Sequence, residues 1–205
     1  MDNIFEYRGA SDLVYAPITK DDSTGYETGT VKELAGLAKL SKKTASTRNT
    51  KFYDNVPAIV TGGTGADDLN IDVSAVPLDT VADITGQVYD DTTGTYIEGE
   101  AAIKYFALGY KTQDTNGNEI YVWRLKGTFN IPDEDHETKK DDGASNGQTL
   151  VYTGISTIHK FQKDGKTHRG VSTNVTQKLI SDEDIAKFFD SVQTPDTITP
   201  KTPSM

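Results

Sequence analysis

Residues 102–131, AIKYFALGYKTQDTNGNEIYVWRLKGTFNI, decide the fold because they have the pattern of a β-hairpin. Two runs rich in aromatic and β-branched residues, 102–111 and 120–131, flank a short polar stretch. That stretch contains Asn116-Gly117, a dipeptide that favours the tight turn between two antiparallel strands. The segment therefore predicts a pair of adjacent strands in a mainly β protein.

The second of these strands predicts which side of the hairpin is buried. Successive side chains of a strand point to opposite faces. One face carries Tyr121, Trp123, Leu125, Phe129 and Ile131, and the other carries Arg124, Lys126, Thr128 and Asn130. We expect the first face to pack inward and the second to lie in polar surroundings.

Four other segments have the pattern of strands. Residues 12–18 (DLVYAPI) are rich in strand-forming side chains, and 66–76 alternate apolar with polar residues. Residues 149–158 show a similar alternation, and 171–175 are expected as the return strand after the turn signal Asp164-Gly165. Together with the hairpin, these segments predict a mainly β fold.

Two helices are expected beside the strands. The segment PLDTVADITG (77–86) has apolar residues at helical spacing, and its Gly86 suits a C-terminal cap. Ser181 can cap the start of SDEDIAKFFDSV (181–192), whose acidic first turn suits the positive end of a helix. The inward positions are Leu78, Val81, Ala82 and Thr85 in the first helix and Ile185, Phe188, Phe189 and Val192 in the second.

The segment 37–55, LAKLSKKTASTRNTKFYDN, is polar on both of its alternating faces and cannot be a core strand. It is a floppy loop, a solvated hairpin, or an arm that finds its partners on another chain. The residues that would form an inter-subunit arm are Lys39, Lys42, Lys43, Arg48, Lys51, Phe52, Tyr53 and Asp54.

Three further segments are expected to lack regular structure. TGGTGADD (61–68) is expected as a flexible turn, because it lacks the Lys-Ser/Thr pair of a phosphate-binding loop. Residues 132–148 form a charged loop, and 194–205 form an extended tail rich in Pro and Thr. A single domain, 1–193, is expected before the tail.

The composition restricts the class of protein. The chain has 205 residues, no cysteine and a formal net charge of -10, so disulfides and thiolate sites are excluded and tight binding of nucleic acid is disfavoured. An acidic wall would still let DNA slide past. The N-terminus lacks the pattern of a signal peptide, and no long apolar run occurs, which predicts a soluble cytosolic product without a membrane segment.

No residue pattern nominates an enzyme, a cofactor or a metal site. His136, His159 and His168 lack the helical spacing of metal ligands. The run DTNGNE (114–119) is faintly similar to a calcium loop, but it lacks the glycine of the sixth position and fits a hairpin turn better. Tyr89 and Tyr96 leave one alternative open, a β-sandwich that binds carbohydrate or a cell surface.

Several short motifs, read in order, resemble the major tail protein family of long-tailed bacteriophages (siphophages) of Gram-positive hosts. The motifs are VYAPITKDD (14–22), VKELAGLAKLS (31–41) leading into KFYDN (51–55), PLDTVADITG (77–86), YFALGYKT (105–112) with EIYVWRLKGTF (119–129), TLVYTGIS (149–156) and a final helix ending near FFDSV (188–192). They span nearly the whole chain. Tyr53-Asp54-Asn55 matches the aromatic-Asp-Asn triplet of the family, and Tyr105-Phe106-Ala107 matches the start of its central hairpin.

The resemblance implies a small β-sandwich or barrel flanked by a helix, which acts as a structural virion protein of the viral tail and is made in the host cytoplasm. It implies hexameric rings that stack into a tail tube, through which DNA passes during ejection without specific binding. The implied partners are further copies of the chain and the tape measure, distal tail and tail terminator proteins. The charged loop 132–148 departs from the family, whose members are often shorter there.

Overall fold

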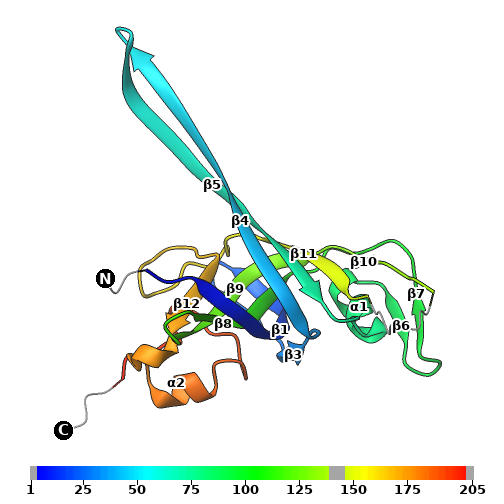
Figure 1. Ribbon diagram of the computed structural model, residues 1–205. Helices are drawn as coiled ribbons and strands as arrows, with labels where there is room; N and C mark the ends of the chain where they lie inside the picture. Colours follow the sequence, from blue (N-terminus) through cyan, green and yellow to red (C-terminus); the bar gives the residue numbers. More distant parts are fainter. Residues whose placement is uncertain (1–3, 139–145, 202–205) are drawn as a thin grey trace.

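The computed structural model describes residues 4–138 and 146–201, and within them one large antiparallel sheet dominates the fold (Figure 1). Its main strands follow the order β2-β1-β8-β9-β11-β5-β4, and β3, β10 and β12 pair with β1, β11 and β9. The bounds are β1 Tyr7–Asp22, β2 Gly25–Thr28, β3 Lys32–Glu33, β4 Leu37–Tyr53, β5 Val56–Val73, β8 Phe106–Asp114, β9 Glu119–Phe129, β10 Asp133–Glu134, β11 Gln148–Gly154 and β12 Gly170–Asn174. The expectation of a mainly β fold is confirmed.

The hairpin expected over 102–131 is present as β8 and β9, although its first strand begins at Phe106. In the turn, the carboxylate of Asp114 accepts hydrogen bonds from the backbone N–H groups of Asn116 and Asn118 at 2.9 and 2.8 Å. Gly117 adopts a φ of 84°, in the left-handed region that glycine tolerates best. The Asn116-Gly117 signal therefore predicted the turn correctly.

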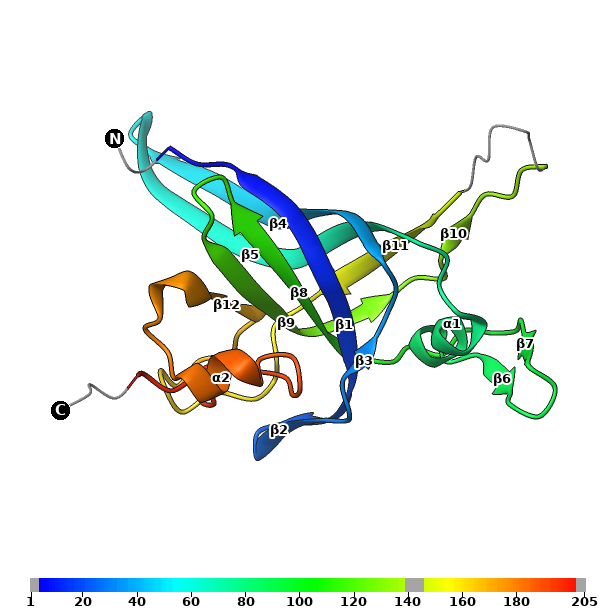
Figure 2. The ribbon, with the colours of Figure 1, turned by 60° about the horizontal axis from the view of Figure 1, so that its bottom comes forward.

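The sheet curls, and its concave face encloses the larger of two hydrophobic cores, which we call the inner core (Figure 2). Its buried members are Leu13, Tyr15, Leu34, Leu69, Ile71, Val73, Val76, Val81, Ile84, Phe106, Leu108, Tyr110, Val122, Leu150 and Tyr152. Leu69, Ile71 and Val73 confirm the alternation expected in 66–76, whereas Ala75 lies exposed beyond the end of β5.

A second cluster, the outer core, covers the other face of the sheet. It consists of Val14, Ala16, Ala107, Trp123, Leu125, Phe161, Phe188 and Val192. Trp123 is fully buried there, and its Nε1 donates a hydrogen bond of 2.9 Å to the carbonyl oxygen of Phe188. The chain that follows β11 thus packs on the sheet as a second layer (Figures 1 and 2).

Strand β9 is therefore buried on both faces, and the expectation of one polar face was wrong. Trp123 points into the outer core, while its neighbour Val122 belongs to the inner core. Opposite Phe106 and Leu108, β9 carries one extra residue. Such a bulge exchanges the faces of the side chains beyond it. Phe129 consequently packs against the inner core instead of lying beside Trp123.

The first expected helix is present as α1, Leu78–Thr85, and it closes one end of the inner core through Val81 and Ile84. Gly86 caps it with a φ of 71°, as expected. Leu78, which was expected to face inward, is 49% exposed because it stands in the first turn. A two-stranded sheet of β6 (Val88–Asp90) and β7 (Thr95–Ile97) lies beside this helix (Figure 2).

The second helix is shorter than its sequence pattern. α2 spans Asp182–Ala186 after Ser181, whose hydroxyl accepts a hydrogen bond of 3.0 Å from the N–H of Asp184. The chain then continues in turns, which still bury Phe188 and Val192. A 3-10 turn, η1 Val175–Gln177, connects β12 to this region.

Two expectations about connections were wrong. Strand β12 pairs with β9, and the turn at Asp164-Gly165 closes only a single bridge between Phe161 and Lys166. Residues 194–201, expected as an extended tail, fold back on the domain, where Pro200 bridges Ile180. Of the tail, 202–205 lie outside the described residues, as do 139–145 of the charged loop.

The described residues contain no helix that is both long enough and apolar enough to cross a membrane.

Candidate functional site

The most distinctive feature is a two-stranded ribbon that projects from the body (Figure 1). Strand β5 pairs with β11 only over Asp67–Val73, whereas it pairs with β4 along its whole length. Residues 46–64 therefore pair only with each other, and we call this part the arm. Its first strand, Ser46 to Tyr53, extends about 26 Å at roughly 3.3 Å per residue.

The arm is exposed to solvent on both faces, because every residue from Ala45 to Gly65 is exposed. Its outer end carries an apolar tip of Phe52, Tyr53, Val56, Ile59 and Val60, each between 46% and 66% exposed. A lone two-stranded ribbon is marginally stable in water, and a contiguous exposed apolar patch is typical of a surface that binds a partner. The arm thus has the composition of a docking element.

The turn at the end of the arm is formed by Asp54 and Asn55, a pair that itself favours a tight hairpin turn. Asp54 and Asn55 adopt φ values of 48° and 63°, so both central residues are left-handed. This is the geometry of a type I′ turn, which matches the twist of a β-hairpin and favours Asn, Asp and Gly. The Asp54-Asn55 pair was used only as part of the family resemblance, although it also predicts the hairpin.

The glycine-rich segment 61–68 was expected as a flexible turn, and this was wrong. It lies within β5, where Thr61, Gly62 and Gly63 pair with Asn49, Arg48 and Thr47. The pairing with β4 holds the segment extended despite its weak strand propensity. Of the three structures considered for 37–55, the floppy loop is excluded and a hairpin is present; whether another chain binds it remains a prediction.

The structure divides the predicted arm residues into two groups. Lys39, Lys42 and Lys43 lie on the part of β4 that is paired with the body sheet, at the base of the arm. The others project with the arm; they are Arg48, Lys51, Phe52, Tyr53 and Asp54.

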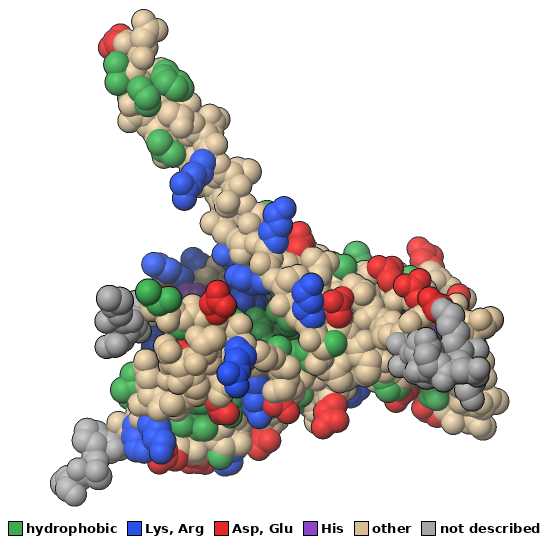
Figure 3. Space-filling model, in the orientation of Figure 1, with side chains coloured by type: hydrophobic (Ala, Val, Ile, Leu, Met, Phe, Trp, Pro, Cys, Tyr) green, Lys and Arg blue, Asp and Glu red, His purple; other side chains and the backbone are tan. Residues whose placement is uncertain are grey.

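No acidic side chain of the described residues neutralises the basic side chains of this segment. Lys39, Lys43, Arg48 and Lys51 form no hydrogen bond or ion pair with the described residues. Lys42 Nζ contacts only the hydroxyl of Thr44, at 3.3 Å. Figure 3 shows Lys and Arg side chains along the arm and around its base, while acidic side chains gather at the end of the body that carries β10. Although the chain is acidic overall, its basic and acidic side chains are thus concentrated in different regions of the surface.

A buried carboxylate, which sequence analysis missed, anchors the base of the arm. Asp67 is 2% exposed and accepts hydrogen bonds from Thr44 Oγ1 at 2.7 Å and from Arg169 Nη1 at 3.0 Å. Arg169 Nη1 also donates to the carbonyl oxygen of Gly65 at 2.7 Å, and Arg124 Nη1 lies 3.7 Å from Asp67. No local signal marks this cluster, because the two arginines are far from Asp67 in the sequence.

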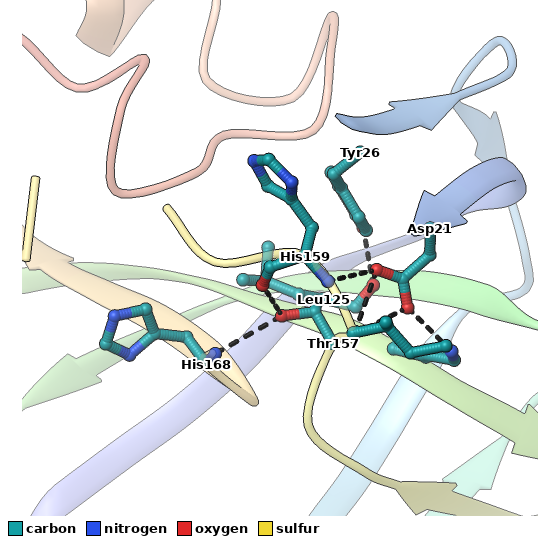
Figure 4. Close-up of polar contacts among 8 residues, drawn as sticks. Asp21, Tyr26, Leu125, Thr157, His159 and His168 are labelled. Atoms are coloured by element: carbon teal, nitrogen blue, oxygen red, sulfur yellow. Dashed lines mark hydrogen bonds and ion pairs between the residues drawn. The ribbon is translucent and has the colours of Figure 1, made fainter. Parts of the chain in front are cut away.

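A second polar cluster holds the body together and is structural (Figure 4). Asp21, at the end of β1, forms an ion pair of 2.6 Å with Lys126 and accepts hydrogen bonds from the N–H groups of Ile158 and His159. Thr157 joins the same segment to His168 through its hydroxyl. Lys126, which was expected on a polar face, is therefore a buried half of an ion pair.

The described residues show no grouping of side chains that would bind a metal ion. No three of their His, Asp and Glu side chains are grouped closely enough to hold a metal ion. His136 and His168 each lie beside a single carboxylate, Glu134 and Asp164. Tyr96 packs against the inner core instead of lining an open groove.

No protein-family model matches the chain, and no curated protein is similar to it.

Proposed function

We propose that this chain is a structural, non-enzymatic subunit that assembles with copies of itself into the tail tube of a bacteriophage. The observation that carries the proposal is the arm, a ribbon exposed on both faces with an apolar tip and with basic side chains that form no ion pair within residues 4–138 and 146–201. A partner that covers the arm would bury these apolar side chains and satisfy its free strand edges. Stacked hexameric rings are the assembly that the family resemblance implies, and we propose that the arms make the contacts between copies.

The charge of the chain supports the proposed passage of DNA. Six copies at -10 each carry about -60 per ring, so acidic residues that face a lumen would repel the phosphate backbone. DNA would move through such a channel without specific binding. In this proposal the tube is part of the virion, and its ends meet the tape measure, distal tail and tail terminator proteins.

The rival function is a binding module for carbohydrate or a cell surface, and it predicts a different state in solution. A binding module is a stable monomer with affinity for glycans, whereas a tube subunit polymerises and needs no small ligand. Light scattering of the purified chain over a concentration series separates the two. We expect the mean particle mass to rise with concentration; a constant monomer mass together with retention on a glycan array would overturn the proposal.

A further inference from the structure

A groove lies between the N-terminal part of β1 and the part of β4 that belongs to the body sheet. Its volume is about 750 Å³, and it is lined by Tyr7, Gly9, Ala10, Ala38, Lys39, Leu40, Lys42, Tyr110, Thr112, Ile120, Val122, Arg124 and Ser172. Figure 3 looks onto the region beneath the base of the arm, where hydrophobic side chains are visible between Lys and Arg side chains. The groove is thus a feature of the body and is distinct from the arm.

The lining of this groove is basic and apolar. It contains Lys39, Lys42 and Arg124 but no acidic side chain, on a chain whose net charge is -10. Arg124 Nε is buried and has no hydrogen-bond partner among the described atoms, and Leu40 and Val122 contribute apolar surface. The positive charges of Lys39 and Lys42, together with this apolar surface, would be complemented by an acidic, partly apolar occupant.

The strands on both sides of the groove have free edges. Among the described residues, β4 pairs only with β5 from Ala38 to Thr44, and β1 pairs only with β8 from Tyr7 to Ser11. Irregularities at Gly9 and Asp12, whose φ values are 76° and 53°, interrupt the pairing of β1. Free N–H and C=O groups along a strand edge are able to bind an added extended segment.

One described segment of the chain matches these requirements. Residues 131–135, IPDED, contain β10, a short strand that pairs with β11 and with no other described strand. Ile131 is 51% exposed, and the side chains of Asp133 and Asp135 have no hydrogen bond or ion pair with the described residues. The segment is extended, acidic and partly apolar, which complements the groove in shape, charge and polarity.

We propose that the groove between β1 and β4 binds the segment 131–135 of a second copy of this chain. The two surfaces lie apart on the body, since β10 is at the end that carries α1, β6 and β7 while the N-terminal half of β1 is at the other end (Figures 1 and 2). A contact between different surfaces of two copies is head-to-tail, and head-to-tail contacts form rings where the rotation between copies closes and open filaments where it does not. The inference rests on the proposed self-assembly and specifies one contact within a ring.

Disulfide crosslinking tests this contact directly, because the chain has no cysteine of its own. The test chain carries two substitutions, Ala38→Cys at the groove and Ile131→Cys in the segment. Both positions are exposed. Mild oxidation should then give a ladder of covalent oligomers, whereas each single variant should stop at dimers. The matched control, Ala38→Cys with Ser191→Cys, places the second thiol at an exposed site outside the segment and should give no ladder.

Charge reversal supplies a second, independent readout. Lys39→Glu with Lys42→Glu in the crosslinking chain should lower the ladder yield by roughly tenfold or more. Adding Asp133→Lys and Asp135→Lys restores opposite charges and should return most of the yield. Recovery of the ladder also shows that the reversed chain folds.

The outcomes separate this inference from the proposed function. Tubes without a ladder would overturn the inference and leave the tube proposal standing. A ladder without tubes would support the contact and count against the tube. A chain that gives neither would overturn both.

Discussion

At the scale of single residues, the ion pair of Asp21 with Lys126 is a buried contact that joins β1 to β9. Their side chains are 4% and 8% exposed, and Asp21 also accepts two backbone N–H groups from the segment after β11. Removing one partner of a buried pair leaves the other charge unpaired, which costs about 3–5 kcal/mol. The substitution Asp21→Asn should therefore lower the free energy of unfolding in urea by about 3 kcal/mol.

The control for this prediction is an exposed ion pair. Glu183 lies 2.7 Å from Lys187, and the side chains are 73% and 61% exposed. Such pairs contribute about 0–1 kcal/mol, so Glu183→Gln should change the unfolding free energy only slightly. Equal losses in the two variants would show that burial does not strengthen the Asp21 contact.

The charge of Asp21 also predicts a dependence on pH. Burial alone would raise the pKa of Asp21, but the hydrogen bonds from Lys126, His159 and Ile158 hold it below the ordinary value of 3.8. A carboxylate whose folded pKa is lowered stabilises the protein above its unfolded pKa and loses this effect as the pH falls through the folded value. The stability difference between wild type and Asp21→Asn should be constant from pH 7 to about pH 5 and shrink below pH 3.8. Urea titrations at each pH measure it, and a difference that persists unchanged at pH 2.5 would contradict it.

At the scale of elements, the base of the arm is held by Arg169, which joins the Gly65 carbonyl to the buried Asp67. Hydrogen bonds to charged groups contribute about 1.5–3 kcal/mol each, so Arg169→Ala should loosen the arm locally. We expect amide hydrogen exchange over 46–64 to become faster while exchange in β8 and β9 stays unchanged. Lys163→Ala, at an exposed residue, is the control, and equal exchange in both variants would show that Arg169 does not anchor the arm.

The elements also show what the sequence was able to predict. The predictions of the β8–β9 hairpin and of α1 were correct because each depends on a local sequence signal. The signal is Asn116-Gly117 for the hairpin and Gly86 for the helix. The second strand of the arm was missed because its glycines have weak strand propensity and only the distant pairing with β4 holds them extended. The bulge that turns Phe129 to the inner core cannot be recognised from the alternation of apolar and polar residues in β9, because it depends on the register with β8.

At the scale of the whole molecule, the account predicts that the basic base of the arm controls assembly. Lys42→Glu with Lys43→Glu reverses two exposed charges, and it should raise the concentration needed for assembly roughly tenfold. Sedimentation over a concentration series measures the change. Lys160→Glu with Lys163→Glu makes the same change of charge at exposed residues elsewhere, so it is the matched control. Unchanged tube length and yield in the Lys42 and Lys43 variant would refute the role of these residues.

The candidate site was predicted in part at this scale. The segment 37–55 was recognised because a long strand with two polar faces cannot belong to a core. The anchor of this segment at Asp67 and the groove between β1 and β4 were not recognised from the sequence. Both bring together residues from strands that are distant in the sequence. The covering of the outer core by the segment after β11 was also not predicted, since this segment is mostly irregular and has no periodic pattern.

Negative-stain electron microscopy of the purified chain over a concentration series is the most direct test of the central claim, that copies of this chain assemble through the arm. Wild type is compared with a tip variant, Phe52→Ser with Val60→Ser, which removes exposed apolar side chains without touching either core. We predict rings or hollow tubes that grow in number and length with concentration for wild type, and far fewer for the tip variant. Monodisperse monomers of the wild-type chain at every concentration would contradict the account.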